Sequence, residues 1–253
     1  MNIENLAQQL DEAALRAEAV DQISLQQSFG VDDAYAIQAA SLQRRYARGE
    51  HFIGLKMGFT SRAKMQQMGV HDMIWGRLTD AMLLPAEGTL SLQKHIHPRA
   101  EPELCFLVNQ PIDRELSAAE APDFVSGIAP AIEVIDSRYR NFKFSLEDVI
   151  ADNCSSAALA VGPWQPTNTP IGDLQMELLI DGAVVHEGNS SAILGDPWKS
   201  FMAATRLAAQ YGQPIPEGAL IMAGAATPAV YLQAGQSVEV RVAQLGEVAF
   251  AVH

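Results

Sequence analysis

Glu101 and Glu103 are separated by one residue within the largely apolar segment Arg99–Phe106. If this segment is a strand, both carboxylates lie on one face, because successive side chains of a strand point to opposite faces. Two carboxylates held that close repel each other and lose hydration, and a hard divalent cation such as Mg²⁺ would neutralise them. Glu133 lies in a second strand-like segment, residues 130–135. We therefore predict a three-carboxylate metal site; the alternative is a strand face that carries ordinary surface acids.

Lys56 is the most informative residue outside this acidic set. It lies in the apolar segment Phe52–Gly58, between Gly54 and Gly58. Burial or a nearby metal cation would lower the pKa of this lysine and make it a usable acid or base. The two glycines permit the close backbone approach that often marks a site. The alternative is a lysine that extends to a sheet edge or is neutralised by a structural carboxylate.

Other polar residues each have a functional and a structural interpretation. Asp80 either hydrogen-bonds a substrate or Lys56, or it forms a turn or a helix cap. His95 and His97 have the spacing of a zinc-binding pair, but no third ligand is evident in the sequence, so an ordinary strand end is favoured. Ser155 either positions a substrate carboxylate or caps the end of a helix.

The composition is that of a globular protein with a core: 48% of the 253 residues are hydrophobic and 19% are charged. The net charge of −13 argues against nucleic acid or an anionic membrane as a partner. An anionic substrate is not excluded, because a bound cation reverses the local field. The N-terminus lacks the features of a signal peptide, and no apolar run reaches the roughly 18 residues that span a bilayer, so we expect a cytoplasmic location. Nucleotide-binding and Gly-x-Ser-x-Gly hydrolase motifs are absent from the sequence.

The order of the predicted elements favours an α+β fold. Apolar spacing predicts amphipathic helices over residues 3–20 and 32–49, a helix over 115–128, and a further helix that begins at Asp196-Pro197. Asp181-Gly182 predicts a tight hairpin turn, and Ser145 with Asp148 predicts a capping box. Because the helices cluster early and the later strands are joined by turns rather than by regular βαβ units, a doubly wound sheet is disfavoured.

Five segments occur in an order that is characteristic of one family. They are Lys56–Lys64, Trp75–Asp80, Glu101–Glu103, Glu133–Arg138 and Ala151–Ser156. Over nearly its whole length the chain resembles the hydratase/decarboxylase family of bacterial meta-cleavage pathways, within the fumarylacetoacetate hydrolase-like superfamily. Met57 and Phe59, together with the segment Met222–Thr227, resemble the decarboxylases of this family more than its hydratases.

The resemblance implies a single catalytic domain over residues 1–253. Its residues 1–50 would form a helical N-terminal part, and residues 51–253 a twisted, mixed β-roll that holds the site. It implies Mg²⁺ or Mn²⁺ as the cofactor and assigns roles to eight residues. The metal ligands would be Glu101, Glu103 and Glu133; the catalytic residues Lys56 and Asp80; and the substrate-binding residues Ser155, Thr60 and Arg77.

The implied activity is the decarboxylation of 2-oxo-3-hexenedioate to 2-hydroxypenta-2,4-dienoate and CO₂ in the degradation of aromatic compounds. The metal would act as a Lewis acid, so no organic cofactor is required. Because the product is an unstable dienol, we expect a complex with the hydratase that consumes it, and we also expect a homo-oligomer. Two alternatives stay open: the 2-hydroxypenta-2,4-dienoate hydratase itself, and a non-catalytic partner subunit of such an enzyme.

Overall fold

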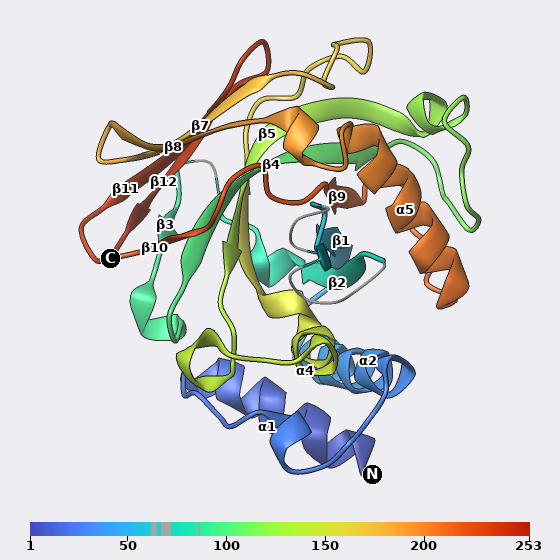
Figure 1. Ribbon diagram of the computed structural model, residues 1–253, viewed down its shortest axis with the longest axis vertical. Helices are drawn as coiled ribbons and strands as arrows, with labels where there is room; N and C mark the ends of the chain where they lie inside the picture. The colour runs from blue at the N-terminus through green and yellow to red at the C-terminus, as the bar shows by residue number, and fades with distance from the viewer. Residues whose placement is uncertain (62–64, 67–71, 86) are drawn as a thin grey trace.

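Two N-terminal helices lie beneath a strongly curled sheet in the computed structural model of the chain (Figure 1). The structure describes residues 1–253 apart from 62–64, 67–71 and 86, so a portion of the segment Lys56–Lys64 lies outside the described residues. Helices and mixed sheets alternate along the chain without regular βαβ units, which confirms the predicted α+β class. Among the described residues, no helix combines the length and the apolar character needed to cross a membrane.

The N-terminal helices are α1, Ile3–Arg16, and α2, Val31–Ala47. Helix α1 ends before the predicted residue 20, because Ala17 adopts a left-handed conformation with φ 52°. Helix α2 begins after Gly30, whose backbone N–H donates to the side chain of Asp33. The apolar faces of both helices join the main hydrophobic core, as expected of amphipathic helices, so the helices are packing elements.

A seven-stranded mixed sheet forms the curled centre of the molecule. Its strand order is β2-β1-β9-β4-β5-β6, and β10 pairs with β4. The strands are β1 Phe52–Gly58, β2 Ile74–Thr79, β4 Arg99–Val108, β5 Val125–Ile135, β6 Ser156–Val161, β9 Leu220–Met222 and β10 Val230–Tyr231. Strands β1 and β9 are parallel and the other pairs are antiparallel.

A second, five-stranded sheet packs against β5 on the side away from the first sheet's hollow (Figure 1). Its strands are β3 Thr89–Leu90, β7 Gln175–Ile180, β8 Ala183–Asn189, β11 Ser237–Val242 and β12 Gly246–Val252. The predicted hairpin turn joins β7 to β8: Asp181 and Gly182 have φ 52° and 78°, the two positive values that a type I′ turn requires.

The remaining helices follow the local signals in two places and contradict them in one. Helix α4, Leu146–Ala151, has the predicted capping box, and α5, Pro197–Gln210, begins at the predicted Asp196 cap. The helix predicted over residues 115–128 is wrong: a short 3-10 turn, Ala121–Phe124, leads directly into β5. Pro122 cannot donate within a helix, and the long pairing of β5 with β4 outweighs the local helical preference.

Strand parity divides the curled sheet into two chemically different faces. On β4 the even-numbered residues Leu104 and Phe106 belong to the main core, and Phe106 packs on Phe201 of α5 with ring centroids 5.1 Å apart. The odd-numbered residues Glu101, Glu103 and Cys105 face the concave side. A small apolar cluster closes that side behind the acids; it comprises Leu78, Met82, Cys105, Ala131, Leu159, Leu220 and Met222.

Candidate active site

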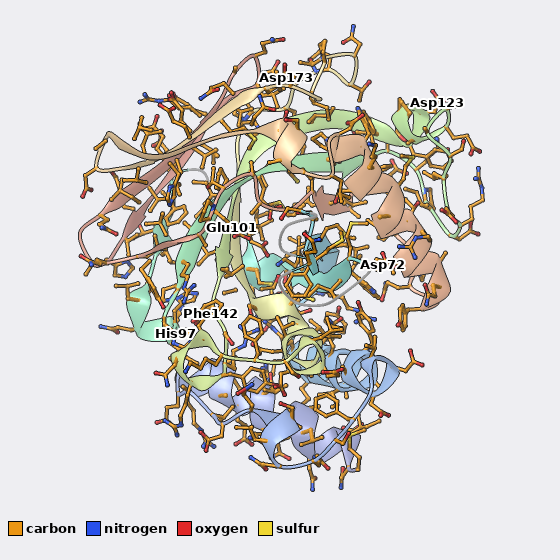
Figure 2. The ribbon with its side chains drawn as sticks, in the orientation of Figure 1. Asp72, His97, Glu101, Asp123, Phe142 and Asp173 are labelled. Carbon is orange, nitrogen blue, oxygen red and sulfur yellow. The ribbon has the colours of Figure 1, made fainter. Side chains whose placement is uncertain are left out.

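Three carboxylates converge on the concave face of the curled sheet. Glu101 of β4 is paired directly with Glu133 of β5, and Glu103 lies two residues further along β4. One oxygen from each residue lies within 4.8 Å of the other two, and all three side chains are buried. Figure 2 shows Glu101 on the inner side of β4. We call these residues the carboxylate triad.

The negative charges of the carboxylate triad are not fully balanced by positive charges or hydrogen-bond donors. Glu103 Oε2 accepts a hydrogen bond of 2.7 Å from the Gly224 backbone N–H, but Glu103 Oε1 is buried without a partner. Burial, reinforced by repulsion from Glu133 and Glu101, raises the pKa of Glu103 well above its usual range. Burial also raises the pKa of Glu133, although the charge of Lys56 opposes this. An all-oxygen, anionic donor set with an unsatisfied buried oxygen fits a hard divalent cation such as Mg²⁺ or Mn²⁺.

Lys56 lies against the triad with only 4% of its surface exposed. Its Nζ is 3.0 Å from Glu133 Oε2 and donates a 3.1 Å hydrogen bond to the carbonyl of Cys154. Burial alone would lower the pKa of Lys56, as the sequence led us to expect, but attraction to Glu133, reinforced by Glu101 and Glu103, outweighs burial and raises the pKa. The expected direction was therefore wrong, because Lys56 is buried as one member of an ion pair.

The backbone beside Lys56 has an unusual conformation. Asn153, Cys154 and Ser155 are three successive non-glycine residues in the left-handed region, with φ of 49°, 52° and 59°. Such residues are disfavoured and persist where surrounding contacts impose them. Here the turn directs the Cys154 carbonyl at Lys56 and leaves Ser155 Oγ buried without a hydrogen-bond partner.

Contacts with β2 hold this left-handed turn in place. The Asn153 side chain accepts from the Arg77 backbone N–H and donates to the Arg77 carbonyl, both at 2.8 Å. Gly76 allows this close approach, because a Cβ at that position would lie 2.6 Å from the Asn153 carbonyl oxygen. The turn is thus fixed to the strand that neighbours Lys56.

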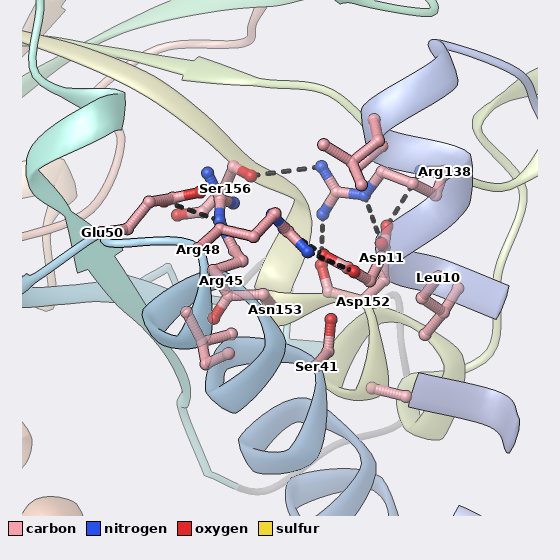
Figure 3. A pocket seen from close by; sticks show the side chains of 14 residues that line it. Leu10, Asp11, Ser41, Arg45, Arg48, Glu50, Arg138, Asp152, Asn153 and Ser156 are labelled. Atoms are coloured by element: carbon pink, nitrogen blue, oxygen red, sulfur yellow. Dashed lines mark hydrogen bonds and ion pairs between the residues drawn. The ribbon is translucent and has the colours of Figure 1, made fainter. Parts of the chain in front are cut away.

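A charged pocket of about 110 Å³ lies behind the turn and joins it to the N-terminal helices (Figure 3). Arg138 pairs there with Asp152 and donates to the Ser156 carbonyl, while Asp11 of α1 pairs with Arg48, the residue that follows α2. Burial raises the pKa of Asp152 to about 6, against the opposing charge of Arg138. Because its cations are paired with its carboxylates, this pocket is a structural support rather than a second site.

A larger pocket of about 490 Å³ opens from the concave face, and Lys56, Glu101 and Ser155 line it. Thr60 is buried nearby: a Cβ at Gly224 would lie 2.1 Å from Thr60 Oγ1, so Thr60 packs on the residue that donates to Glu103. The structure therefore brings together Lys56, the triad, Ser155 and Thr60. The pocket also contains residues that our sequence reasoning missed, namely Arg99, Phe142, Lys143 and Ile74.

Arg77 does not face this pocket, contrary to its predicted role in substrate binding. It is paired with Leu55, so its side chain lies on the face of the sheet opposite to that of Lys56. There its guanidinium lies 4.5 Å from the ring centroid of Trp75 and donates to Gln38 of α2. Arg77 thus contributes to the packing between sheet and helices.

Asp80 is also remote from Lys56 and exposed, contrary to its predicted catalytic role. It follows Thr79, which pairs with Phe52 at the opposite end of β1 from Lys56. Its carboxylate accepts from the backbone N–H groups of His51 and Ala81, each at 2.9 Å. The alternative interpretation of Asp80 as a turn and cap residue is the one that the structure supports.

His95 and His97 hydrogen-bond backbone carbonyls, of Ser91 and Ser137 respectively, just before β4 begins. The triad is the only potential metal-binding group among the residues that the structure describes. These histidines therefore fit the ordinary strand end that the sequence favoured.

Comparison with known proteins agrees with this geometry. Residues 45–253 match the family model described as fumarylacetoacetate (FAA) hydrolase C-terminal. The chain is 48% identical to a 4-oxalocrotonate decarboxylase from a Pseudomonas species, over 99% of this chain and 98% of that protein. It is 33% identical to a 2-keto-4-pentenoate hydratase from Paraburkholderia xenovorans (strain LB400), over 86% of this chain and 82% of that protein.

A solved structure gives the same result at the level of the fold. The 4-oxalocrotonate decarboxylase from Pseudomonas putida G7, complexed with magnesium and adipate, matches with a TM-score of 0.94 and 33% identity, over 99% of this chain and 97% of that chain. The curled sheet is therefore the expected β-roll. The chain belongs to the hydratase/decarboxylase family of the fumarylacetoacetate hydrolase-like superfamily.

Proposed function

We propose that this protein is a carboxy-lyase that converts 2-oxo-3-hexenedioate to 2-hydroxypenta-2,4-dienoate and CO₂ in the meta-cleavage degradation of aromatic compounds. The observation that carries the proposal is the buried carboxylate triad with Lys56 ion-paired to it. The likeness to 4-oxalocrotonate decarboxylases over nearly the whole chain supports the choice of reaction.

Glu101, Glu103 and Glu133 would hold Mg²⁺ or Mn²⁺; Glu103 offers its unpartnered Oε1. When bound, the cation supplies a Lewis acid for the 2-oxo oxygen, where negative charge develops as the electrons of the broken C–C bond move through the conjugated chain, a contribution of several kcal/mol. The triad itself thus fixes which end of the substrate lies deepest in the pocket.

Lys56 is the acid/base residue in this proposal. In the metal-free protein, attraction to Glu133 raises the pKa of Lys56, and the Cys154 carbonyl and Glu133 fix the direction of its N–H groups. Nζ can therefore deliver the proton that the 2-hydroxyl group of the product carries after CO₂ has left. Ser155 Oγ, buried without a partner in the same pocket, is assigned to hydrogen-bond the substrate, and Thr60 supports the Gly224–Glu103 contact.

We also propose that the whole chain acts as one catalytic unit, with residues 1–50 as its helical base. Gln38 of α2 supports this, because its amide donates to the backbone carbonyls of Trp75 in β2 and Ile150 in α4. In the same proposal the enzyme is a cytoplasmic homo-oligomer. It associates with a 2-hydroxypentadienoate hydratase, since its product is an unstable dienol.

Hydration of 2-hydroxypenta-2,4-dienoate is the second candidate, because a hydratase can use the same triad and lysine, and hydratases are among the relatives. A non-catalytic subunit is less well supported, since it has no use for a buried lysine and three buried glutamates.

The test is to supply the purified protein and Mg²⁺ with 2-oxo-3-hexenedioate and measure CO₂, and separately to follow water addition to 2-hydroxypentadienoate. Metal-dependent CO₂ release is the expected result. Water addition without CO₂ release would establish the hydratase instead, and inactivity in both assays with metal bound would favour the non-catalytic subunit.

A further inference from the structure

We propose that Arg99 is a specificity-determining residue that binds the substrate carboxylate remote from the 2-oxo group. The inference rests on the proposed function only for the identity of the substrate as a 2-oxo dicarboxylate. Arg99 lies at the start of β4, two residues before Glu101, so both side chains belong to the same face of the strand. Both residues line the pocket of the concave face.

The guanidinium of Arg99 is held between two aromatic rings. Its central carbon lies 3.9 Å from the ring centroid of Phe142 and 4.1 Å from that of Tyr231, and Nη2 donates to the Tyr231 hydroxyl. These contacts fix the plane of the guanidinium before any ligand arrives, and a planar, preorganised fork is suited to bidentate carboxylate binding. Figure 2 shows Phe142 and Glu101 on neighbouring parts of the molecule.

Arg99 lacks the carboxylate partner that most arginines of this protein have. Among the described arginines, only Arg99 and Arg77 have no carboxylate oxygen within 4.0 Å. Arg77 instead donates hydrogen bonds to the side chains of Gln38 and Gln213. By contrast, Arg99 Nε is buried and has no hydrogen-bond partner. A buried guanidinium N–H without an acceptor is unfavourable, so an anion supplied from outside would satisfy it.

The position of Arg99 relative to the triad selects the length of the ligand. Residues two apart on a strand are separated by roughly 7 Å. A six-carbon chain can therefore place its 2-oxo acid end at the triad and its second carboxylate at Arg99. A ligand without that second carboxylate would leave Arg99 Nε unpaired, so this residue discriminates 2-oxo dicarboxylates from 2-oxo monocarboxylates.

Arg99 stabilises the carboxylate before it loses its charge, so its contribution belongs to binding rather than to the chemical step. Removal of Arg99 should therefore raise KM about 10- to 100-fold, the value of one charge-assisted contact, while kcat does not fall, because an interaction that disappears as the carboxylate loses its charge does not lower the barrier. This separation of KM from kcat is not expected of a residue whose only role is to support the fold.

The test compares Arg99→Gln, Arg99→Lys and wild type in binding 2-oxohexanedioate and 2-oxohexanoate, by calorimetry on the Mg²⁺-loaded protein. Arg99→Gln should bind the dicarboxylate about 10- to 100-fold more weakly and the monocarboxylate within about threefold of wild type. Arg99→Lys should be intermediate for the dicarboxylate, because it keeps the charge but loses the fork. It also provides a second, more conservative variant should the glutamine protein fail to fold.

Arg114→Gln is the matched control, because Arg114 also lies over an aromatic ring, at 5.8 Å from the Phe124 centroid, but is exposed and outside the pocket. It should bind both ligands as wild type does. Equal loss of both ligands in the Arg99 variants, or no loss of either, would overturn the proposal. Absence of CO₂ release by the wild type would overturn the proposed function alone, since the binding comparison does not depend on which reaction follows.

Discussion

Replacement of Glu103 by glutamine should stabilise the metal-free protein and abolish tight metal binding. An oxygen of Glu103 lies within 4.8 Å of oxygens of both Glu101 and Glu133. At an effective dielectric constant of about 20, two unit charges at that separation repel by about 3–4 kcal/mol. Lys56 offsets some of this repulsion, and protonation of a carboxyl whose pKa is raised limits the remainder.

The glutamine side chain keeps an oxygen for the Gly224 N–H and places an amide donor where Glu103 Oε1 has no partner. We therefore expect the free energy of unfolding in EDTA to rise by about 2 kcal/mol, or about 4–8 °C in Tm. Loss of one anionic ligand should weaken Mg²⁺ binding by at least about 100-fold, so that added Mg²⁺ no longer raises Tm.

The assay is thermal unfolding in EDTA and across a Mg²⁺ titration. Glu115→Gln serves as the control, because Glu115 is exposed and remote from the triad, and it should behave as wild type in both series. Two results would refute the claim that the buried triad carries unbalanced negative charge: a Glu103→Gln protein that is less stable than wild type in EDTA, or one whose Tm rises with Mg²⁺ as much as that of wild type.

Three further outcomes are expected. Lys56→Ala should still bind Mg²⁺, as measured by calorimetry, but lose turnover; unchanged turnover would remove Lys56 from the mechanism. In EDTA the variant should be about 3 kcal/mol less stable than wild type, because Glu133 is left as an unpaired buried charge. Because burial raises the pKa of Glu103 and Glu133, the metal-free protein should lose stability as pH rises from the ordinary glutamate pKa through the raised values. Over the same pH range Mg²⁺ binding should strengthen and release protons, which calorimetry in buffers of different ionisation enthalpy would detect. Mg²⁺ binding that is independent of pH would contradict this expectation. Gly224→Ala should lower the free energy of unfolding, measured with denaturant, by about 3 kcal/mol, because φ is +101° and the new Cβ would lie 2.1 Å from Thr60 Oγ1. Gly235→Ala, where φ is also positive but no atom lies within 4 Å of the new Cβ, should lower it less; equal losses would show that the contact with Thr60 is unimportant.

The local geometry of the site was predictable from the sequence, because it depends on strand parity alone. Glu101 and Glu103 share a face as soon as their segment is a strand. The pairing of Glu101 with Glu133 depends on the register between β4 and β5, which no local pattern specifies. The strand-like segment 130–135 made Glu133 a candidate third ligand, and the family resemblance supported that assignment.

The errors have the same physical origin. Arg77 and Asp80 lie in a recognised segment, but the register of β1 with β2 turns Arg77 to the helix side and places Asp80 at the far end of the strand from Lys56. The pKa of Lys56 is raised rather than lowered because its carboxylate partners come from two other strands, β4 and β5. Arg99 is the exception: the spacing that identified Glu101 also places Arg99 on its face, so the sequence contained a signal that went unused.

The most direct test of the central claim is CO₂ release from 2-oxo-3-hexenedioate by the protein in three states: stripped with EDTA, reloaded with Mg²⁺, and reloaded with Mg²⁺ after Glu103→Gln substitution. The third state is a separately purified Glu103→Gln protein. We predict no release from the stripped wild type, release from the reloaded wild type, and none from the Glu103→Gln protein at a Mg²⁺ concentration that saturates wild type. Release that persists in EDTA, or that is undiminished in the Glu103 variant, would contradict the claim that the buried carboxylate triad is the catalytic metal site.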